Sequence, residues 1–224
     1  MNPKLIATDL DGTLVNDRKI SQNDKIVLRR LFSENIPVIP VTTRMRFSTA
    51  QILTDTSLFT QPLVCNNGAR ILKSGWEKIG STKELVRKEL DLDIAKKISK
   101  YADEQGYLMT TIFAEKKFWV KEKLKEKIHD EPNEITEFIE NNTQALAKNT
   151  PISFMIHDDI NEKEALKDME NFCEKNLKKR LTLHRHHKSN RWIGLTIYPK
   201  EVNKLDGVTS SQTPEGVGLP IHSP

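Results

Sequence analysis

The sequence predicts an α/β fold: a Rossmann-like parallel sheet core, incomplete at its C-terminal end, with an inserted α/β cap domain. Up to about residue 80, short apolar runs alternate with helical patterns, which is typical of parallel strands joined by right-handed crossovers. From about residue 82 to 190 the chain is rich in Lys and Glu, and an apolar run then returns. We therefore expect a core formed by residues 1–81 and 189–224 and a cap formed by residues 82–188.

The first three elements of the core follow from local patterns. Leu5–Leu10 is an apolar run that predicts a strand buried on both faces. Ser21–Asn35 predicts a helix, because Ser21 stands at the N-cap position and Asp24 falls in the first turn. Ile36–Val41 is a second apolar run, and its prolines favour an edge or irregular strand.

The later elements are predicted from apolar spacing. In the core we expect a helix at Phe47–Asp55 and strands at Leu63–Cys65 and Ile193–Pro199. The polar stretch Glu131–Asn149 fits either a helix or a loop, and Thr209–Pro224 is predicted to be irregular. In the cap, the same spacing predicts two helices and three strands: Leu92–Gln105, Glu162–Leu177, Leu108–Ile112, Ile152–Ile156 and Leu181–His187.

Composition argues against several classes of protein. A hydrophobic fraction of 37% and a charged fraction of 29% are those of an ordinary globular protein. No apolar run is long enough to cross a bilayer and the N-terminus has no signal-peptide pattern, so we expect no membrane partner. Cys65 and Cys173 are too few for a disulfide framework or a zinc site, which favours a reducing, cytoplasmic location. The net charge of +4 suits anionic small molecules and does not require nucleic acid.

The stretch Asp9-Leu10-Asp11-Gly12-Thr13 carries the strongest chemical pattern in the chain. Residues two apart on an extended backbone point the same way, so Asp9 and Asp11 are expected to face one site at the carboxyl end of a strand. Like charges this close repel each other unless a cation separates them, and Mg²⁺ completed by a phosphate would do so. A turn or helix-capping role is the alternative, since Asp-Gly is common in turns.

This string resembles the first motif of the haloacid dehalogenase superfamily of aspartate-nucleophile phosphatases. The resemblance implies that Asp9 attacks phosphorus and forms an aspartyl phosphate, which divides one hard displacement into two easier ones. It implies that Asp11 protonates the leaving group and then activates water. It also implies Mg²⁺ as the cofactor, held by the carboxylate of Asp9 and the backbone carbonyl of Asp11.

Two further strings extend the resemblance. Val41-Thr42-Thr43-Arg44 resembles the second motif, in which the residue matching Thr42 hydrogen-bonds the phosphoryl group; many members carry Gly at the position of Thr43. The alternative is that these threonines cap the following helix. Asn66-Asn67-Gly68-Ala69 resembles the Cof-type branch, whose cap is an α/β lobe. It also fits a hairpin turn. We expect Thr42, Thr43 and Asn67 at the phosphate site.

Tyr198-Pro199-Lys200-Glu201-Val202-Asn203-Lys204 resembles the segment that carries the third motif. The resemblance assigns Lys204 to charge balance at the aspartyl phosphate, a task that fixed cationic donors perform in many enzymes. The alternative is an ordinary surface lysine.

The family's fourth, acidic motif has no counterpart here. The acids beyond Lys204 are Asp206 and Glu215, and neither follows an apolar strand. We therefore expect weak Mg²⁺ binding and reduced activity. The missing neighbour strand would also leave Leu5–Leu10 as an exposed edge, which favours self-association.

The sequence thus predicts a Mg²⁺-dependent phosphatase of small phosphorylated metabolites such as sugar phosphates. The main alternative is a non-catalytic protein that binds phosphate or a partner. His184 and His186 share one face of a predicted strand, and Lys178–Arg191 is basic. A solvated or substrate-facing cap strand explains both features more simply than a metal site or a nucleic-acid surface.

Overall fold

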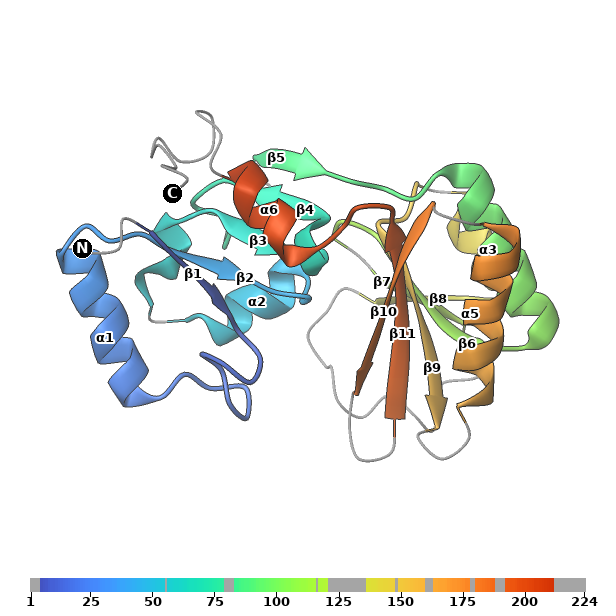
Figure 1. Ribbon diagram of the computed structural model, residues 1–224, viewed down its shortest axis with the longest axis horizontal. Helices are drawn as coiled ribbons and strands as arrows, with labels where there is room; N and C mark the ends of the chain where they lie inside the picture. The colour runs from blue at the N-terminus through green and yellow to red at the C-terminus, as the bar shows by residue number, and fades with distance from the viewer. Residues whose placement is uncertain are drawn as a thin grey trace. The chain divides into compact units, whose positions relative to one another are not determined.

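The computed structural model describes residues 5–54, 56–78, 83–115, 117–120, 136–147, 149–159, 163–177, 180–187 and 192–211 (Figure 1). The chain forms two compact units. One contains Met1–Arg87 and Val202–Pro224, and the other contains Lys88–Glu201. An α/β core with an inserted α/β unit is therefore confirmed, while both boundaries of the insertion lie further along the chain than the expected residues 82 and 188.

The first unit is built on a sheet with the strand order β1-β2-β3-β4-β5. The parallel pairs β1–β2 and β2–β3 form the Rossmann-like part, and β4 and β5 extend the sheet in antiparallel fashion. The strands are β1 Ile6–Asp9, β2 Val38–Val41, β3 Leu63–Cys65, β4 Arg70–Leu72 and β5 Glu84–Arg87.

Helices cover both faces of this sheet. The apolar cluster on one face contains Leu28 from α1, and the cluster on the other face takes in Val208 from α6. The N-cap of α1 is Ser21, whose Oγ accepts a hydrogen bond from the N–H of Asp24 at 3.0 Å, so the predicted helix start is confirmed. The helical segments are α1 Gln22–Ser33, α2 Arg46–Ile52, η1 Ser57–Thr60, η2 Asn66–Gly68 and α6 Lys204–Ser211.

Two predictions about the first strands are wrong. The prolines of Ile36–Val41 favoured an edge or irregular strand, and the edge is wrong: β2, which contains Pro40, is an internal strand of the described sheet. β3 pairs with β2 at Val41, beyond Pro40, so the missing N–H of this proline interrupts no hydrogen bond in that described pairing. β1 is the edge strand among the described residues and is not buried on both faces, because Ala7 is exposed.

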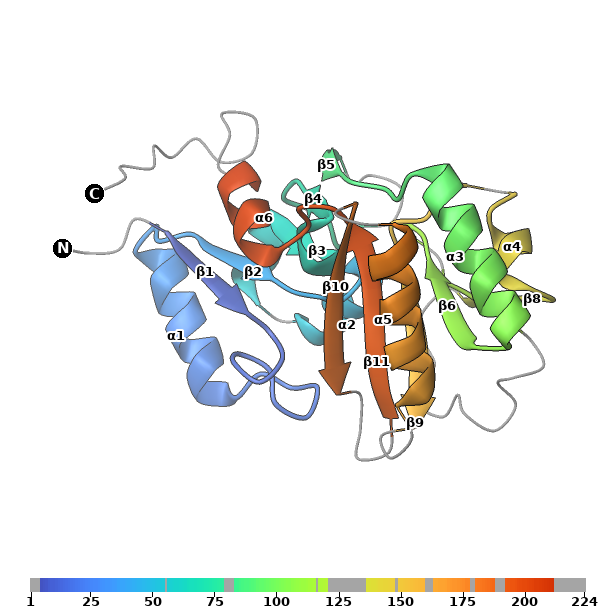
Figure 2. The ribbon, with the colours of Figure 1, turned by 45° about the vertical axis from the view of Figure 1, so that its right-hand side comes forward.

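The second unit is a separate sheet with helices packed on one face. Its strand order is β10-β11-β9-β6-β7-β8, and helices α3 and α5 lie along the sheet (Figure 2). Apolar side chains of both helices pack against it. The strands are β6 Leu108–Ile112, β7 Lys117–Val120, β8 Thr136–Ile139, β9 Ser153–Asp159, β10 Leu181–His187 and β11 Trp192–Pro199; the helices are α3 Leu92–Gln105, α4 Asn142–Ala145 and α5 Glu164–Asn176.

The strand predicted at Ile193–Pro199 exists, but it belongs to the second unit. β11 lies between β10 and β9 and pairs with each of them in antiparallel register. Its alternate side chains Ile193, Leu195 and Ile197 are buried in the cluster beneath α3 and α5. The second unit therefore needs this strand for its core, and its boundary moves from residue 188 to Glu201.

Asp168 of α5 links this helix to α3. The hydroxyls of Tyr101 and Tyr107 both donate to its Oδ2, and the ring of Phe172 stacks on Tyr101 with the centroids 4.0 Å apart. The hydrogen bonds from Tyr101 and Tyr107 lower the pKa of Asp168. The hydrogen bond to Asp168 raises the pKa of Tyr101 to about 12.

Asp168→Ala is expected to lower the free energy of unfolding by about 0.5–1.5 kcal/mol at neutral pH, because it removes the acceptor of two partly buried hydroxyls that water can then reach. The folded-state pKa of Asp168 lies below the unfolded value, so its contribution is present above about pH 4 and is lost as the pH falls through the folded-state pKa. Urea unfolding of wild type and variant, at neutral pH and in acid, measures this. If the difference in free energy of unfolding between wild type and variant is the same in acid as at neutral pH, the prediction is contradicted.

The described helices include none with the length and apolar character that a bilayer crossing requires.

Candidate active site

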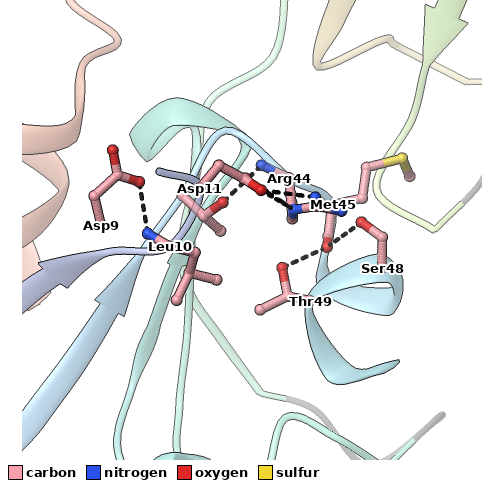
Figure 3. A network of polar contacts seen from close by, with 8 residues as sticks. Asp9, Leu10, Asp11, Arg44, Met45, Ser48 and Thr49 are labelled. Atoms are coloured by element: carbon pink, nitrogen blue, oxygen red, sulfur yellow. Dashed lines mark hydrogen bonds and ion pairs between the residues drawn. The ribbon is translucent and has the colours of Figure 1, made fainter. Parts of the chain in front are cut away.

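Asp9 ends β1 at the edge of the sheet where parallel β1 and β2 both finish, opposite Val41. Its Oδ1 accepts a hydrogen bond from the N–H of Leu10 at 2.7 Å, which orients the carboxylate (Figure 3). Its Oδ2 accepts one from Nζ of Lys204 at 2.6 Å. The side chains of Asp9 and Lys204 are 39% and 33% exposed, so a ligand can reach this ion pair from solvent.

Asp11 lies in the tight turn that follows β1. Gly12 adopts a φ of +73° there, which a residue with a Cβ rarely does. Arg44 donates two hydrogen bonds to the Asp11 carboxylate: Nε lies 2.8 Å from Oδ2, and Nη2 lies 2.7 Å from Oδ1 (Figure 3). This two-point geometry fixes the direction of the carboxylate.

The two aspartates therefore have different cationic partners. Lys204 offsets the charge of Asp9, and Arg44 offsets that of Asp11. Within the described part of the chain, no three His, Cys, Asp or Glu side chains form a metal-binding group. The carboxylate of Asp9 and the backbone carbonyl of Asp11 are still suitable donors for Mg²⁺, which often takes one or two protein oxygens and keeps several waters.

The threonines predicted at the phosphate site lie directly after β2. Thr42 is buried; its Oγ1 accepts the N–H of Arg44 at 3.1 Å, and its carbonyl accepts the N–H of Asn67 at 2.9 Å. Thr43 is exposed. Helix α2 has Met45 at its N-cap, so the alternative of Thr42 or Thr43 as the helix cap is wrong.

Lys204 is the first residue of α6. Asn203 precedes it and forms a reciprocal cap with Asp206: Oδ1 of Asn203 accepts the Asp206 N–H at 2.9 Å, and Nδ2 donates to Asp206 Oδ2 at 2.7 Å. The Asp206 carboxylate is thus engaged at the helix start. Glu215 lies outside the described residues.

The family model of the haloacid dehalogenase-like hydrolases matches residues 6–216 of the chain. The chain belongs to this family. No curated protein sequence matches it.

Solved structures of other haloacid dehalogenase-like hydrolases share the fold. A Thermotoga maritima protein is 19% identical with a TM-score of 0.74, and the alignment covers 94% of this chain and 74% of that one. A hydrolase from Bacteroides thetaiotaomicron is 16% identical with a TM-score of 0.76, with coverages of 96% and 78%. A subclass IIB sugar phosphatase is 13% identical with a TM-score of 0.69, with coverages of 96% and 76%.

Arg44 is the residue of this hydrolase that sequence reasoning left without a role. It stands in the quoted string after β2, next to two threonines expected to meet phosphate. A cation directly after a strand end, at the edge where two carboxylates were also expected, was an available signal. Its choice of Asp11 as partner depends on a contact between residues 33 positions apart, which no local pattern predicts.

The histidines and part of the basic stretch of the predicted cap lie on β10. The rings of His184 and His186 lie 6.0 Å apart and nearly parallel on β10. His186 lies across Gly194, where an added Cβ would be 2.7 Å from its Nε2. Arg185, within the basic stretch, forms an ion pair with Glu170 of α5. Residues 178, 179 and 188–191 of that stretch lie outside the described residues.

Proposed function

We propose that this hydrolase is a Mg²⁺-dependent phosphatase of the Cof-type branch that cleaves small phosphorylated metabolites, such as sugar phosphates, through an aspartyl phosphate. The ion pair of Asp9 with Lys204 carries the proposal. It joins residues 195 positions apart in the sequence, each expected from a separate motif, with a heavy-atom separation of 2.6 Å. A half-exposed carboxylate beside a cation, at the end of parallel strands, suits attack on an anionic phosphoester.

In the proposed reaction, an Asp9 oxygen bonds to phosphorus as the phosphorus–oxygen bond to the alcohol breaks. Asp11 gives its proton to the departing alcohol and later takes one from water. That water attacks phosphorus, releases inorganic phosphate and regenerates Asp9. Lys204 offsets charge at the phosphoryl group, Thr42, Thr43 and Asn67 hold its oxygens, and Arg44 must release Asp11 for the proton transfers.

When bound, Mg²⁺ would offset negative charge on the phosphoryl oxygens. Asp9 would hold it through its carboxylate and Asp11 through its backbone carbonyl. Because no third acidic ligand joins these two among the described residues, we expect weak Mg²⁺ affinity and modest turnover.

Release of phosphate from p-nitrophenyl phosphate and from a panel of sugar phosphates tests the proposal. We expect release that rises with Mg²⁺ across a wide concentration range and stops when a chelator is added. No release from any ester at high Mg²⁺ concentration would refute the enzymatic function.

The alternative is a protein that binds phosphate without turnover, and the small set of acidic ligands near Asp9 favours it. Calorimetry with inorganic phosphate distinguishes the two functions: binding together with no hydrolysis supports the alternative. The substrate, the cytoplasmic location and the expectation of no nucleic-acid or membrane partner all stay proposals.

We also propose that the protein self-associates through the edge of β1, because β1 ends the strand order of the described residues and every second N–H and C=O of an edge strand faces away from its neighbour. Ala7→Lys puts a charge on this exposed strand and is expected to abolish association. Sedimentation at several concentrations measures it, with Leu92→Lys, at a 39% exposed apolar residue of α3, as the control. Equal association in wild type and Ala7→Lys would exclude this edge.

A further inference from the structure

The turn η2 touches the start of α6 with no side chain between their backbones. A Cβ added to Gly68 would lie 2.2 Å from the carbonyl oxygen of Asn203. A Cβ added to Gly207 would lie 2.4 Å from Cγ1 of Val64 and 3.0 Å from Cα of Gly68. The added Cβ atoms would thus lie closer to Asn203 and Val64 than real Cβ atoms come to any neighbour. Each position therefore accepts only glycine while η2 and α6 stay this close.

The same turn is hydrogen-bonded on its other side to Thr42–Arg44, the segment after β2 that is expected to bind phosphate and is called the phosphate loop below. The N–H of Asn66 donates to the carbonyl of Arg44, and the N–H of Asn67 donates to the carbonyl of Thr42, each at 2.9 Å. Asn66, Asn67 and Gly68 all have positive φ values, of 50°, 59° and 95°. Asn and Gly are the residues that adopt this backbone most readily, which explains the Asn-Asn-Gly sequence.

Lys204 begins the helix that rests on this turn. The Asn203–Asp206 cap and the bond from Gly207 N–H to Asn203 carbonyl, at 3.2 Å, make the first turn of α6 one rigid piece. A shift of Asn203 or Gly207 therefore moves Lys204 with it. Nζ of Lys204 lies 2.6 Å from Oδ2 of Asp9, so the Lys204 side chain or the ion pair must take up such a shift.

We propose that the Gly68–Gly207 contact positions Lys204, by setting the distance between α6 and the phosphate loop so that its ammonium meets the Asp9 carboxylate. Gly68 and Gly207 are positioning residues that act through Lys204. Their part in catalysis rests on the proposed phosphatase function, whereas their effect on the ion pair does not.

Gly207→Ala tests this, because its Cβ must displace α6 from Val64. The readout is the rate at which an amine-reactive reagent modifies Lys204, followed by peptide mass spectrometry. We expect severalfold faster modification than in wild type, since the amine leaves Asp9 and becomes accessible. Val64→Ala/Gly207→Ala removes the colliding methyl and should restore slow modification, with Val64→Ala alone as its reference.

Gly68→Ala meets backbone and should therefore not be rescued by Val64→Ala. Its matched control is Gly75→Ala: Gly75 has a similar φ of +82° but nothing within 4 Å of an added Cβ. Both variants suffer the same backbone strain, and only Gly68→Ala should expose Lys204. If Gly207→Ala does not fold, Val64→Ile pushes on the same contact and should give a smaller increase in modification.

Hydrolysis provides the second readout. A misplacement near 1 Å is expected to lower kcat/KM by about tenfold to a hundredfold. In a Lys204→Met background, Gly207→Ala should cause little further loss, because its effect passes through Lys204. The positioning role would be overturned if the reagent modified Lys204 at the wild-type rate in folded Gly207→Ala and Gly68→Ala proteins. If modification is faster in these variants but no protein, wild type included, hydrolyses phosphoesters, the positioning role is upheld and the phosphatase function is refuted.

Discussion

Asp9→Asn is expected to lower Mg²⁺-dependent phosphate release by at least about a thousandfold, the largest effect of any single substitution in this chain. Asparagine keeps the size of the side chain, and its carbonyl oxygen can still accept the Leu10 N–H that Oδ1 accepts in the wild type. It lacks the charged oxygen that would attack phosphorus and the charge that pairs with Lys204. The loss should therefore fall on kcat, with a folded protein.

Steady-state phosphate release and acid-quenched trapping of phosphoprotein measure this effect. Wild type should yield a trapped phosphoprotein that Asp9→Asn does not. Glu34→Gln is the matched control, since it also breaks an ion pair with a cation, the exposed Arg30–Glu34 pair on α1 at 2.8 Å, and should leave turnover unchanged. Hydrolysis that survives in Asp9→Asn at the wild-type rate would exclude Asp9 as the nucleophile.

Elements set by local pattern were predicted well from the sequence. Ser21 caps α1 as expected, because capping depends on a side chain and a backbone N–H three residues apart. Asp9 stands at the end of β1 for a similar reason: an apolar run followed by Asp-x-Asp-Gly predicts both the strand and its end. The contact of Lys204 with Asp9 followed from two family motifs and not from spacing.

Features that depend on distant neighbours were not predictable in this way. The apolar run of β11 fits either sheet equally well, and only its pairing with β9 and β10 assigns it to the second unit. Pro37 and Pro40 suggested an edge or irregular strand, because the position at which β3 pairs with β2 was unknown. β4 and β5 begin or end with charged residues, Arg70, Glu84 and Arg87, and so do not stand out as apolar runs.

The engagement of Asp11 by Arg44, 33 positions away, belongs to the same class. The Asn203–Asp206 cap spans only three residues and is a local contact like that of Ser21. Sequence reasoning identified the carboxylate of Asp11 and its strand-end position, while its partner came from tertiary packing.

Lys204→Met is expected to lower kcat by about a hundredfold to a thousandfold, because in the proposed reaction Lys204, which pairs with Asp9, offsets the charge that the phosphoryl oxygens gain during transfer. Methionine keeps much of the length of the side chain, so α6 and its Asn203–Asp206 cap should remain intact. The variant leaves Asp9 without its cation. Mg²⁺ then has no competitor for this carboxylate, and the Mg²⁺ concentration for half-maximal activity should stay the same or fall.

A lower kcat together with an unchanged or lower Mg²⁺ requirement distinguishes a catalytic lysine from a structural one. A lysine that merely held α6 in its position would, on removal, disturb the Asp9 carboxylate and raise the Mg²⁺ requirement while turnover fell. Titrations of Mg²⁺ against initial rate, for wild type, Lys204→Met and Lys204→Arg, measure both quantities. Lys204→Arg keeps the charge but not the compact ammonium, so it should recover part of kcat. A kcat of Lys204→Met equal to that of wild type would leave the Asp9–Lys204 pair as a surface contact and exclude Lys204 from catalysis.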